Sequence, residues 1–133
     1  MKKRPTILVA DDEEPLLKLL KVSFGLEGYN VVTANNGLAA LQAFERHQPD
    51  LAVLDIGMPG MDGFGVLEFI RQHSDIPVIM ITARDDPDYQ RRALAAGADD
   101  FLSKPFDRAE LMGSVRAKLN GSRSRRPWQR SRR

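Results

Sequence analysis

Four short apolar segments of the chain lead into side chains that can bind a metal ion or an anion. Asp11 and Asp12 follow the first segment, and Asp55 closes the second. Thr82 closes the third segment, and Lys104 follows the fourth. Carboxylates are ligands for hard cations, whereas a hydroxyl and an ammonium group donate hydrogen bonds to anions. These residue types therefore allow metal-assisted chemistry on an anionic group.

The place of these residues after strand-like segments predicts that they meet. In open α/β sheets, ligands bind outside the carboxyl ends of the strands. Three carboxylates gathered there repel one another, and burying them without compensation is costly. A hard divalent cation removes the conflict, and oxygen ligands from a few carboxylates plus water favour Mg²⁺. Lys104 adds a second positive charge, so the sequence predicts a site for a dianionic phosphoryl group beside a metal ion.

Strand-like and helical segments alternate along the chain and would position these residues. The strand-like segments are short and apolar, whereas the helical ones repeat apolar residues with a helical period. Gly28 and Gly97 follow two of the helical segments as stop signals. The predicted strands are 6–10, 30–34, 51–55, 77–82 and 100–103, and the predicted helices are 14–27, 38–47, 64–73, 88–96 and 108–119.

Five successive βα units predict an α/β fold in three layers, with a doubly wound parallel sheet covered by helices on both faces. Three of the strands are continuous apolar runs, as expected when both faces of a strand are buried. The chain of 133 residues suits one domain, since domains run to about 100–200 residues.

Composition narrows the class of protein further. The absence of cysteine excludes disulfide frameworks, thiol catalysis, zinc–thiolate sites and iron–sulfur clusters. No apolar run approaches the span of about 20 residues that a membrane helix needs, and the N-terminus has no long apolar centre of a signal peptide. We therefore expect a cytoplasmic protein without a membrane partner.

The net charge of +2 is distributed unevenly. Residues 121–133 contain six arginines and no acidic residue, so residues 1–120 are net negative. We predict a domain over 1–120 and, over 121–133, a basic disordered tail or the remnant of a linker. An acidic domain argues against direct nucleic-acid binding by the domain itself.

Other phosphate-handling classes lack their signatures. The chain has no Gly-x-x-x-x-Gly-Lys-Ser/Thr run, which excludes a P-loop, and Gly60, Gly63 and Gly65 do not form a Gly-x-Gly-x-x-Gly dinucleotide motif. A haloacid-dehalogenase-type phosphatase also uses a strand-end Asp with Mg²⁺. It needs a second Asp two residues later, where this chain has Gly57.

The segments after the predicted strands resemble those of response-regulator receiver domains of two-component signalling. The shared motifs are Asp11-Asp12, Asp-Ile-Gly-Met-Pro-Gly-Met-Asp-Gly at 55–63, Thr82-Ala83 and Lys104-Pro105-Phe106. The resemblance covers residues 6–120 and implies a CheY-like, flavodoxin-like sheet of strand order 2-1-3-4-5. Gly-Ala-Asp-Asp-Phe at 97–101 and the last helix resemble the OmpR/PhoB-type receivers.

The resemblance implies a phosphoacceptor and a metal site. Asp55 would attack a phosphoryl group and form an acyl phosphate. Mg²⁺ would be held by the side chains of Asp12 and Asp55 and by the backbone carbonyl of Gly57, with Asp11 joining through water. A backbone N–H near Gly57 would bind a phosphoryl oxygen.

The remaining motif residues would bind the phosphoryl group or transmit its arrival. Lys104, Thr82 and a backbone N–H near Ala83 would contact phosphoryl oxygens. Pro105 would follow a cis peptide bond. Phe101 occupies the position of the family's aromatic switch, for which plain core packing is the alternative interpretation.

The function implied is a phosphorylation-activated switch and not an enzyme with external substrates, because the chain would catalyse only its own phosphorylation and dephosphorylation. A sensor histidine kinase would be the donor. Phosphorylation would reshape the face formed by 88–96, 100–103 and 108–119, a surface for a homodimer, and a DNA-binding output domain would belong to the full-length protein. Two alternatives stay open: an Mg²⁺-dependent aspartyl phosphatase and a phosphorylation-independent binding module.

Overall fold

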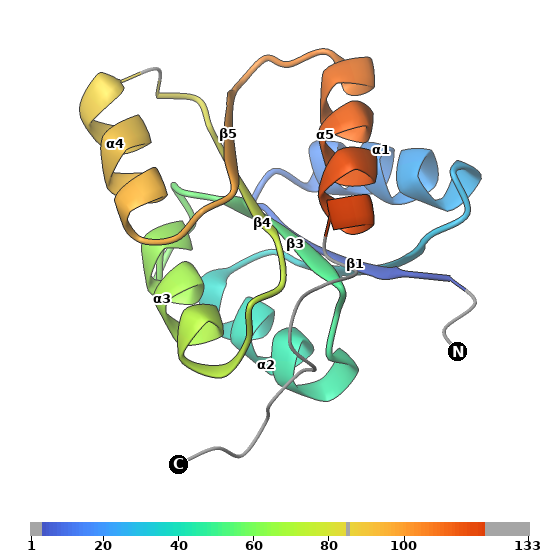
Figure 1. Ribbon diagram of the computed structural model, residues 1–133, viewed down its shortest axis with the longest axis horizontal. Coiled ribbons are helices and arrows are strands. Elements are labelled where there is room, and N and C mark those ends of the chain that lie inside the picture. The colour runs from blue at the N-terminus through green and yellow to red at the C-terminus, as the bar shows by residue number, and fades with distance from the viewer. Residues whose placement is uncertain (1–3, 85, 122–133) are drawn as a thin grey trace.

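One parallel sheet of five strands lies between two layers of helices (Figure 1). The structure is a computed structural model that describes residues 4–84 and 86–121. The strands lie side by side in the order β2-β1-β3-β4-β5, which confirms the predicted fold class and strand order. Their bounds are β1 Thr6–Ala10, β2 Asn30–Ala34, β3 Leu51–Asp55, β4 Val78–Thr82 and β5 Asp100–Ser103.

The helices divide between the two faces of the sheet (Figure 1). Helices α1 and α5 pack with one cluster of core residues, whereas α2, α3 and α4 pack with the other. In the described part of the chain, no helix is long and apolar enough to cross a membrane. The bounds are α1 Glu14–Leu26, α2 Gly37–His47, α3 Gly63–His73, α4 Pro87–Ala95 and α5 Arg108–Gly121.

The burial of the central strands on both faces explains why their sequences are apolar without interruption. Ile7 and Val9 of β1 pack under α1 and α5, while Leu8 and Ala10 pack toward α2 and α3. All four side chains are fully buried. Because alternate residues of a strand point to opposite faces, a sheet covered on both sides needs apolar residues at every position.

Three helices begin one residue earlier than their apolar periodicity predicts, because a side chain before each of them caps the first turn; before α4 it is Asp86, which accepts a hydrogen bond from the Asp88 backbone at 3.0 Å. Asn36 accepts a hydrogen bond from the Ala39 backbone at 2.8 Å, and Asp62 accepts one from the Gly65 backbone at 3.1 Å. These caps satisfy backbone N–H groups that have no partner inside the helix. The Asp62 side chain thus fixes the start of α3.

The end of the last helix differs from the expected boundary between domain and tail. Helix α5 continues through Gly121, the residue at which the tail was predicted to begin. The rest of the predicted tail, residues 122–133, lies outside the described residues. The domain as described therefore ends with α5 packed on the sheet next to α1.

Gly63 marks the closest approach of a helix to the strand that carries Asp55. A Cβ added at Gly63 would lie 2.5 Å from the Asp55 carbonyl oxygen and 2.8 Å from the Ile56 Cα. Both are backbone atoms and cannot turn aside as a flexible side chain would. The N-terminus of α3 can therefore pack against the end of β3 only with glycine at this position.

We expect Gly63→Ala to lower the free energy of unfolding by about 1–3 kcal/mol, the usual cost of overpacking a tight site. Gly113→Ala is the matched control, since Gly113 lies inside α5 and a Cβ there meets nothing within 4 Å. That control should gain up to about 1 kcal/mol from better helix propensity. Urea unfolding of both variants measures the difference, and equal effects of the two substitutions would contradict the close approach.

Candidate functional site

Three carboxylates meet at the carboxyl ends of the neighbouring strands β1 and β3. Asp11 and Asp12 directly follow β1, and Asp55 is the last residue of β3. One oxygen from each of the three carboxylates lies within 4.8 Å of the others. Asp11 is fully buried, Asp55 is 4% exposed and Asp12 is open to solvent. The structure therefore gathers the acidic residues that the sequence placed at strand ends.

Lys104 brings a positive charge into this acidic cluster. Its Nζ lies 2.9 Å from Asp11 Oδ2, 3.5 Å from Glu13 Oε2 and 3.6 Å from Asp55 Oδ1. Burial opposes the charged form of the ammonium, but the hydrogen bond and charge of Asp11, with the charges of Asp55 and Glu13, raise the pKa of Lys104 overall. The peptide bond between Lys104 and Pro105 is cis. The ammonium therefore stays charged and offsets part of the repulsion among the carboxylates.

The three carboxylates carry more negative charge than the Lys104 ammonium offsets, so the site can accept a further cation. Asp11 Oδ2 lies 2.9 Å from the Lys104 ammonium, and among the described residues no further donor reaches it. A buried carboxylate oxygen is costly when its charge is incompletely compensated. Oxygen ligands from Asp11, Asp12 and Asp55 are the donors that Mg²⁺ prefers, so the residues present fit a hard divalent cation.

Asp55 itself sits in surroundings that disfavour its charge. Burial, followed by repulsion from Asp11, raises the pKa of its carboxyl from the ordinary 3.8 to about 6, although Lys104 and a hydrogen bond from the Gly57 backbone act in the opposite direction. A cation beside Asp55 would lower this pKa again. The carboxylate is consequently a group whose ionisation depends on what binds next to it.

Thr82 and Ala83 follow β4, the strand beside β3. The register pairs Asp55 with Ile81, so Thr82 lies one residue further along the same edge of the sheet. The Thr82 hydroxyl is buried and accepts a hydrogen bond from the Arg84 backbone at 3.1 Å. Ala83 is exposed at the rim of the site.

Gly57 contacts the Asp55 carboxylate, whereas Phe101 packs against the core. Gly57 is exposed in the loop after β3, and its backbone hydrogen-bonds to the Asp55 carboxylate. Phe101 pairs with Met80 in the register of β4 and β5. Its ring is partly buried against the core on the side of α3 and α4.

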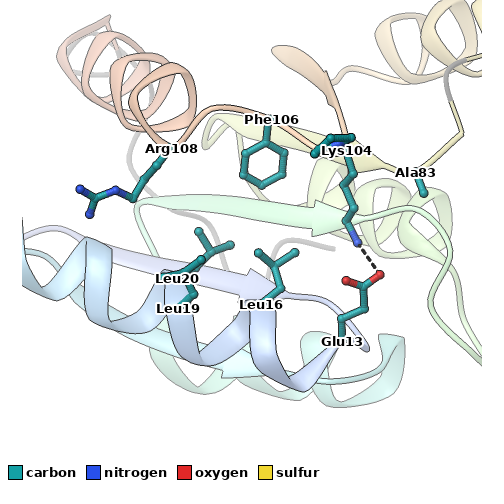
Figure 2. A pocket seen from close by; sticks show the side chains of 9 residues that line it. Glu13, Leu16, Leu19, Leu20, Ala83, Lys104, Phe106 and Arg108 are labelled. Carbon is teal, nitrogen blue, oxygen red and sulfur yellow. Dashed lines mark hydrogen bonds and ion pairs between the residues drawn. The ribbon is translucent and has the colours of Figure 1, made fainter.

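A groove beside Lys104 was not predicted from the sequence. It has a volume of about 410 Å³ and lies between α1 and the segment that follows β5 (Figure 2). Apolar side chains line most of it, and Glu13 and Lys104 form its rim (Figure 2). The apolar lining residues include Leu16, Leu19, Leu20 and Phe106. The groove could have been suspected from the motif alone, because Phe106 follows Lys104-Pro105 and α1 follows Asp12.

Residues 7–116 match the family described as the response regulator receiver domain. This chain belongs to that family. The receiver domain is 42% identical over 119 residues to the probable transcriptional regulator ycf27 of Galdieria sulphuraria, covering 90% of this chain and 47% of that protein. It is 42% identical over 111 residues to the transcriptional regulatory protein KdpE of Mycobacterium tuberculosis, covering 84% of this chain and 49% of that protein.

Solved structures agree with the family at the level of the whole fold. The receiver domain of the Francisella response regulator 1452 has a TM-score of 0.84 and 31% identity, covering 90% of this chain and all of that one. The BeF3-activated receiver domain of Klebsiella pneumoniae RstA has a TM-score of 0.82 and 28% identity, covering 86% of this chain and 97% of that one. This receiver domain therefore spans about half the length of its sequence relatives and nearly all of these isolated receivers.

Removing the buried charge of Asp55 should stabilise the receiver domain when no metal is present. Asp55 keeps its proton to a higher pH in the folded chain than in the unfolded chain, so native stability falls as the pH rises from 3.8 to about 6. We expect Asp55→Asn in EDTA to raise the free energy of unfolding at neutral pH by about 1–3 kcal/mol.

The gain should disappear below pH 3.8, where the folded and unfolded chains both carry a protonated Asp55. Glu45→Gln, at an exposed position of α2, is the control and should change stability little. Urea unfolding across the pH range measures both variants. An Asp55→Asn chain that is less stable than its parent at neutral pH would show that the carboxylate is well compensated without a cation.

Proposed function

We propose that Asp55 accepts a phosphoryl group and that its phosphorylation switches the receiver domain between two signalling states. The observation that carries this proposal is the placement of the Asp55 carboxylate beside two further carboxylates and 3.6 Å from the Lys104 ammonium. An Asp55 oxygen forms the new bond to phosphorus, and the bond from phosphorus to the donor atom breaks. The donor leaves with that electron pair, and the product is an acyl phosphate.

Mg²⁺ is part of this proposal. Asp11, Asp12 and Asp55 would hold the ion, together with the backbone carbonyl of Gly57 and with water. When bound, Mg²⁺ neutralises charge on phosphoryl oxygens as they approach the carboxylates. The fit of the three acidic side chains and the incompletely compensated Asp11 oxygen support it.

The other residues of the edge would bind the phosphoryl group after transfer. The Lys104 ammonium would exchange its present carboxylate partners for a phosphoryl oxygen, and the Thr82 hydroxyl and the Ala83 backbone N–H would donate hydrogen bonds to the others. Attack of water on the phosphorus would later break its bond to the Asp55 oxygen, release inorganic phosphate and return Asp55 to its free carboxylate. Both steps concern the chain's own side chain, so we propose no external substrate.

The residue two positions after Asp55 weighs against the alternative of a phosphatase acting on other molecules. Such an enzyme needs a general acid to protonate the leaving group, and Gly57 has no side chain. The alternative of a binding module without phosphorylation leaves the costly cluster of buried carboxylates without a use. The phosphorylation switch accounts for both features.

A sensor histidine kinase is the proposed donor, and helix α1 the surface that receives it. Leu19, Val22 and Leu26 follow one another at spacings of three and four residues and are 55%, 61% and 79% exposed. Leu19 also lines the apolar groove that leads to Lys104 (Figure 2). Contiguous exposed apolar side chains mark surfaces for protein partners, and here they would bring the donor's phosphohistidine to Asp55.

The output would be carried by a second surface beside the site. Phosphorylation would reshape the face made by α4, β5 and α5, with Phe101 moving inward as Thr82 turns, and this face could pair with a second copy. The relatives are transcriptional regulators about twice as long. We therefore propose that the full-length protein carries a DNA-binding output domain and works in the cytoplasm.

Labelling by a small phosphodonor tests the acceptor and the metal together. Asp55→Asn should abolish covalent labelling by acetyl phosphate, and EDTA or Asp12→Ala should abolish or strongly reduce labelling of the parent, because the phosphoryl charge is then not neutralised. Asp62→Asn, in the nearby loop, is the control and should label normally. Intact mass spectrometry measures the added phosphoryl group, and stoichiometric labelling of the Asp55→Asn chain would refute the assignment.

Val22→Glu tests the donor surface separately from the chemistry. A charge in the apolar stripe should lower phosphotransfer from a histidine kinase by about tenfold or more, as for the central residues of an interface, and leave labelling by acetyl phosphate unchanged. Leu38→Glu on α2 is the matched control, because both side chains are 61% exposed. Equal phosphotransfer rates for the two variants would place the donor elsewhere.

A further inference from the structure

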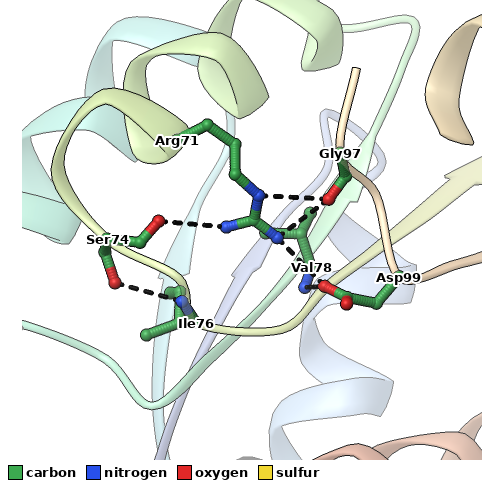
Figure 3. A network of polar contacts seen from close by, with 6 residues as sticks. All are labelled: Arg71, Ser74, Ile76, Val78, Gly97 and Asp99. Atoms are coloured by element: carbon green, nitrogen blue, oxygen red, sulfur yellow. Dashed lines mark hydrogen bonds and ion pairs between the residues drawn. The ribbon is translucent and has the colours of Figure 1, made fainter. Parts of the chain in front are cut away.

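Helix α4 is held at its two ends by contacts of different strength. At the C-terminal end, Arg71 of α3 donates from Nε and Nη2 to the Gly97 carbonyl at 3.1 and 2.9 Å (Figure 3). The same guanidinium pairs with Asp99 at 3.0 Å. Asp99 also accepts a hydrogen bond from the Val78 backbone of β4 at 2.8 Å (Figure 3). These charge-assisted contacts tie the turn after α4 to both α3 and the sheet.

The anchor at this end is well shielded from water. The side chains of Arg71 and Asp99 are only 21% and 22% exposed, and hydrogen bonds that involve charged groups are among the stronger ones in proteins. Gly97 has a φ of +105°, and a Cβ there would come within 3.1 Å of the Arg71 Nε. The C-terminal end of α4 is therefore a fixed point.

At the N-terminal end, the contact is an exposed stack centred on Tyr89. The guanidinium carbon of Arg84 lies 4.4 Å from the centre of the Tyr89 ring, and Nη1 donates to the Tyr89 hydroxyl at 3.1 Å. Arg84 also pairs with Asp86 at 3.3 Å. Its side chain is 63% exposed, so these contacts are weak and can be exchanged for water.

Tyr89 contacts both α3 and the loop that follows β4. The ring of Tyr89 also meets Phe64 of α3, with centroids 5.7 Å apart and planes at 89°. Phe64 follows Gly63, whose backbone packs on the end of β3. Arg84 belongs to the loop after β4, and its backbone N–H donates to the Thr82 hydroxyl at 3.1 Å. Tyr89 thus links the first turn of α3 with the loop after Thr82.

We propose that Tyr89 is a latch, a positioning residue that holds the N-terminal end of α4 and the Thr82 side chain in the unphosphorylated arrangement. The inference rests on the proposed function. When Thr82 turns toward a phosphoryl group on Asp55, it gives up the Arg84 N–H. Arg84 and Tyr89 then separate, and α4 swings at its N-terminal end about the fixed point at Gly97.

The latch opposes the phosphorylated state, so its removal should favour binding of a phosphoryl mimic. We expect Tyr89→Leu to bind beryllofluoride with Mg²⁺ about threefold to fivefold more tightly than the parent, the size of effect that exposed cation–π and ion-pair contacts allow. Tyr89→Phe keeps both ring contacts and should stay within about twofold of the parent. Dissociation constants from NMR titration of backbone amides measure these differences.

Tyr29→Leu is the matched control, because Tyr29 is the other tyrosine of the chain and packs on Phe24 at the opposite face of the sheet. It should lose stability without tighter binding of the mimic. In the same titration, amide shifts of the parent should be large at 88–90 and small at 97–99. Arg84→Gln removes the guanidinium from the stack and should also bind the mimic more tightly than the parent. It tests the latch independently if Tyr89→Leu folds poorly.

The outcomes separate the latch from the proposed function. A parent chain that does not bind beryllofluoride overturns both. A parent that binds, with Tyr89→Leu and Arg84→Gln of equal or lower affinity, overturns the latch alone. Tighter binding by Tyr29→Leu would show a general effect of lost stability and would likewise overturn it.

Discussion

Like charges crowded at the end of an apolar sheet set the conditions for the rest of this structure. The carboxylates of Asp11 and Asp55 are buried at the ends of neighbouring strands, and Asp12 adds a third charge within 4.8 Å. Lys104 compensates part of this charge but is shared among several acids. Carboxylates buried with incomplete compensation cost stability, so the edge gains most from binding a cation and an anion together.

The parallel sheet makes this crowding unavoidable. Strands β1, β3 and β4 run in the same direction and end at one edge, so whatever follows each of them lies close to the others. Apolar residues cover both faces and leave no room for the strands to separate. The approach of Gly63 to the Asp55 backbone fixes the end of β3 further. The repelling carboxylates are thus held close together by a rigid frame.

Two surfaces lead away from the same edge, on opposite faces of the sheet. The groove beside α1 is apolar and ends at the Lys104 ammonium, so a partner seated there reaches the site directly. The other route passes through Thr82, Arg84 and Tyr89 to α4. Because the sheet separates α1 from α4, these two surfaces do not overlap.

The order and type of the elements, and the set of residues at the strand ends, could be predicted from the sequence, because apolar periodicity and motif spacing are local properties. The contrast between buried Asp11 and exposed Asp12 could not, since it depends on which way each residue points after β1. The pairing of Lys104 with Glu13, and the stack of Arg84, Tyr89 and Phe64, join residues from separate elements. Tertiary structure alone decides such contacts, because sequence distance carries no information about which helix faces pack together.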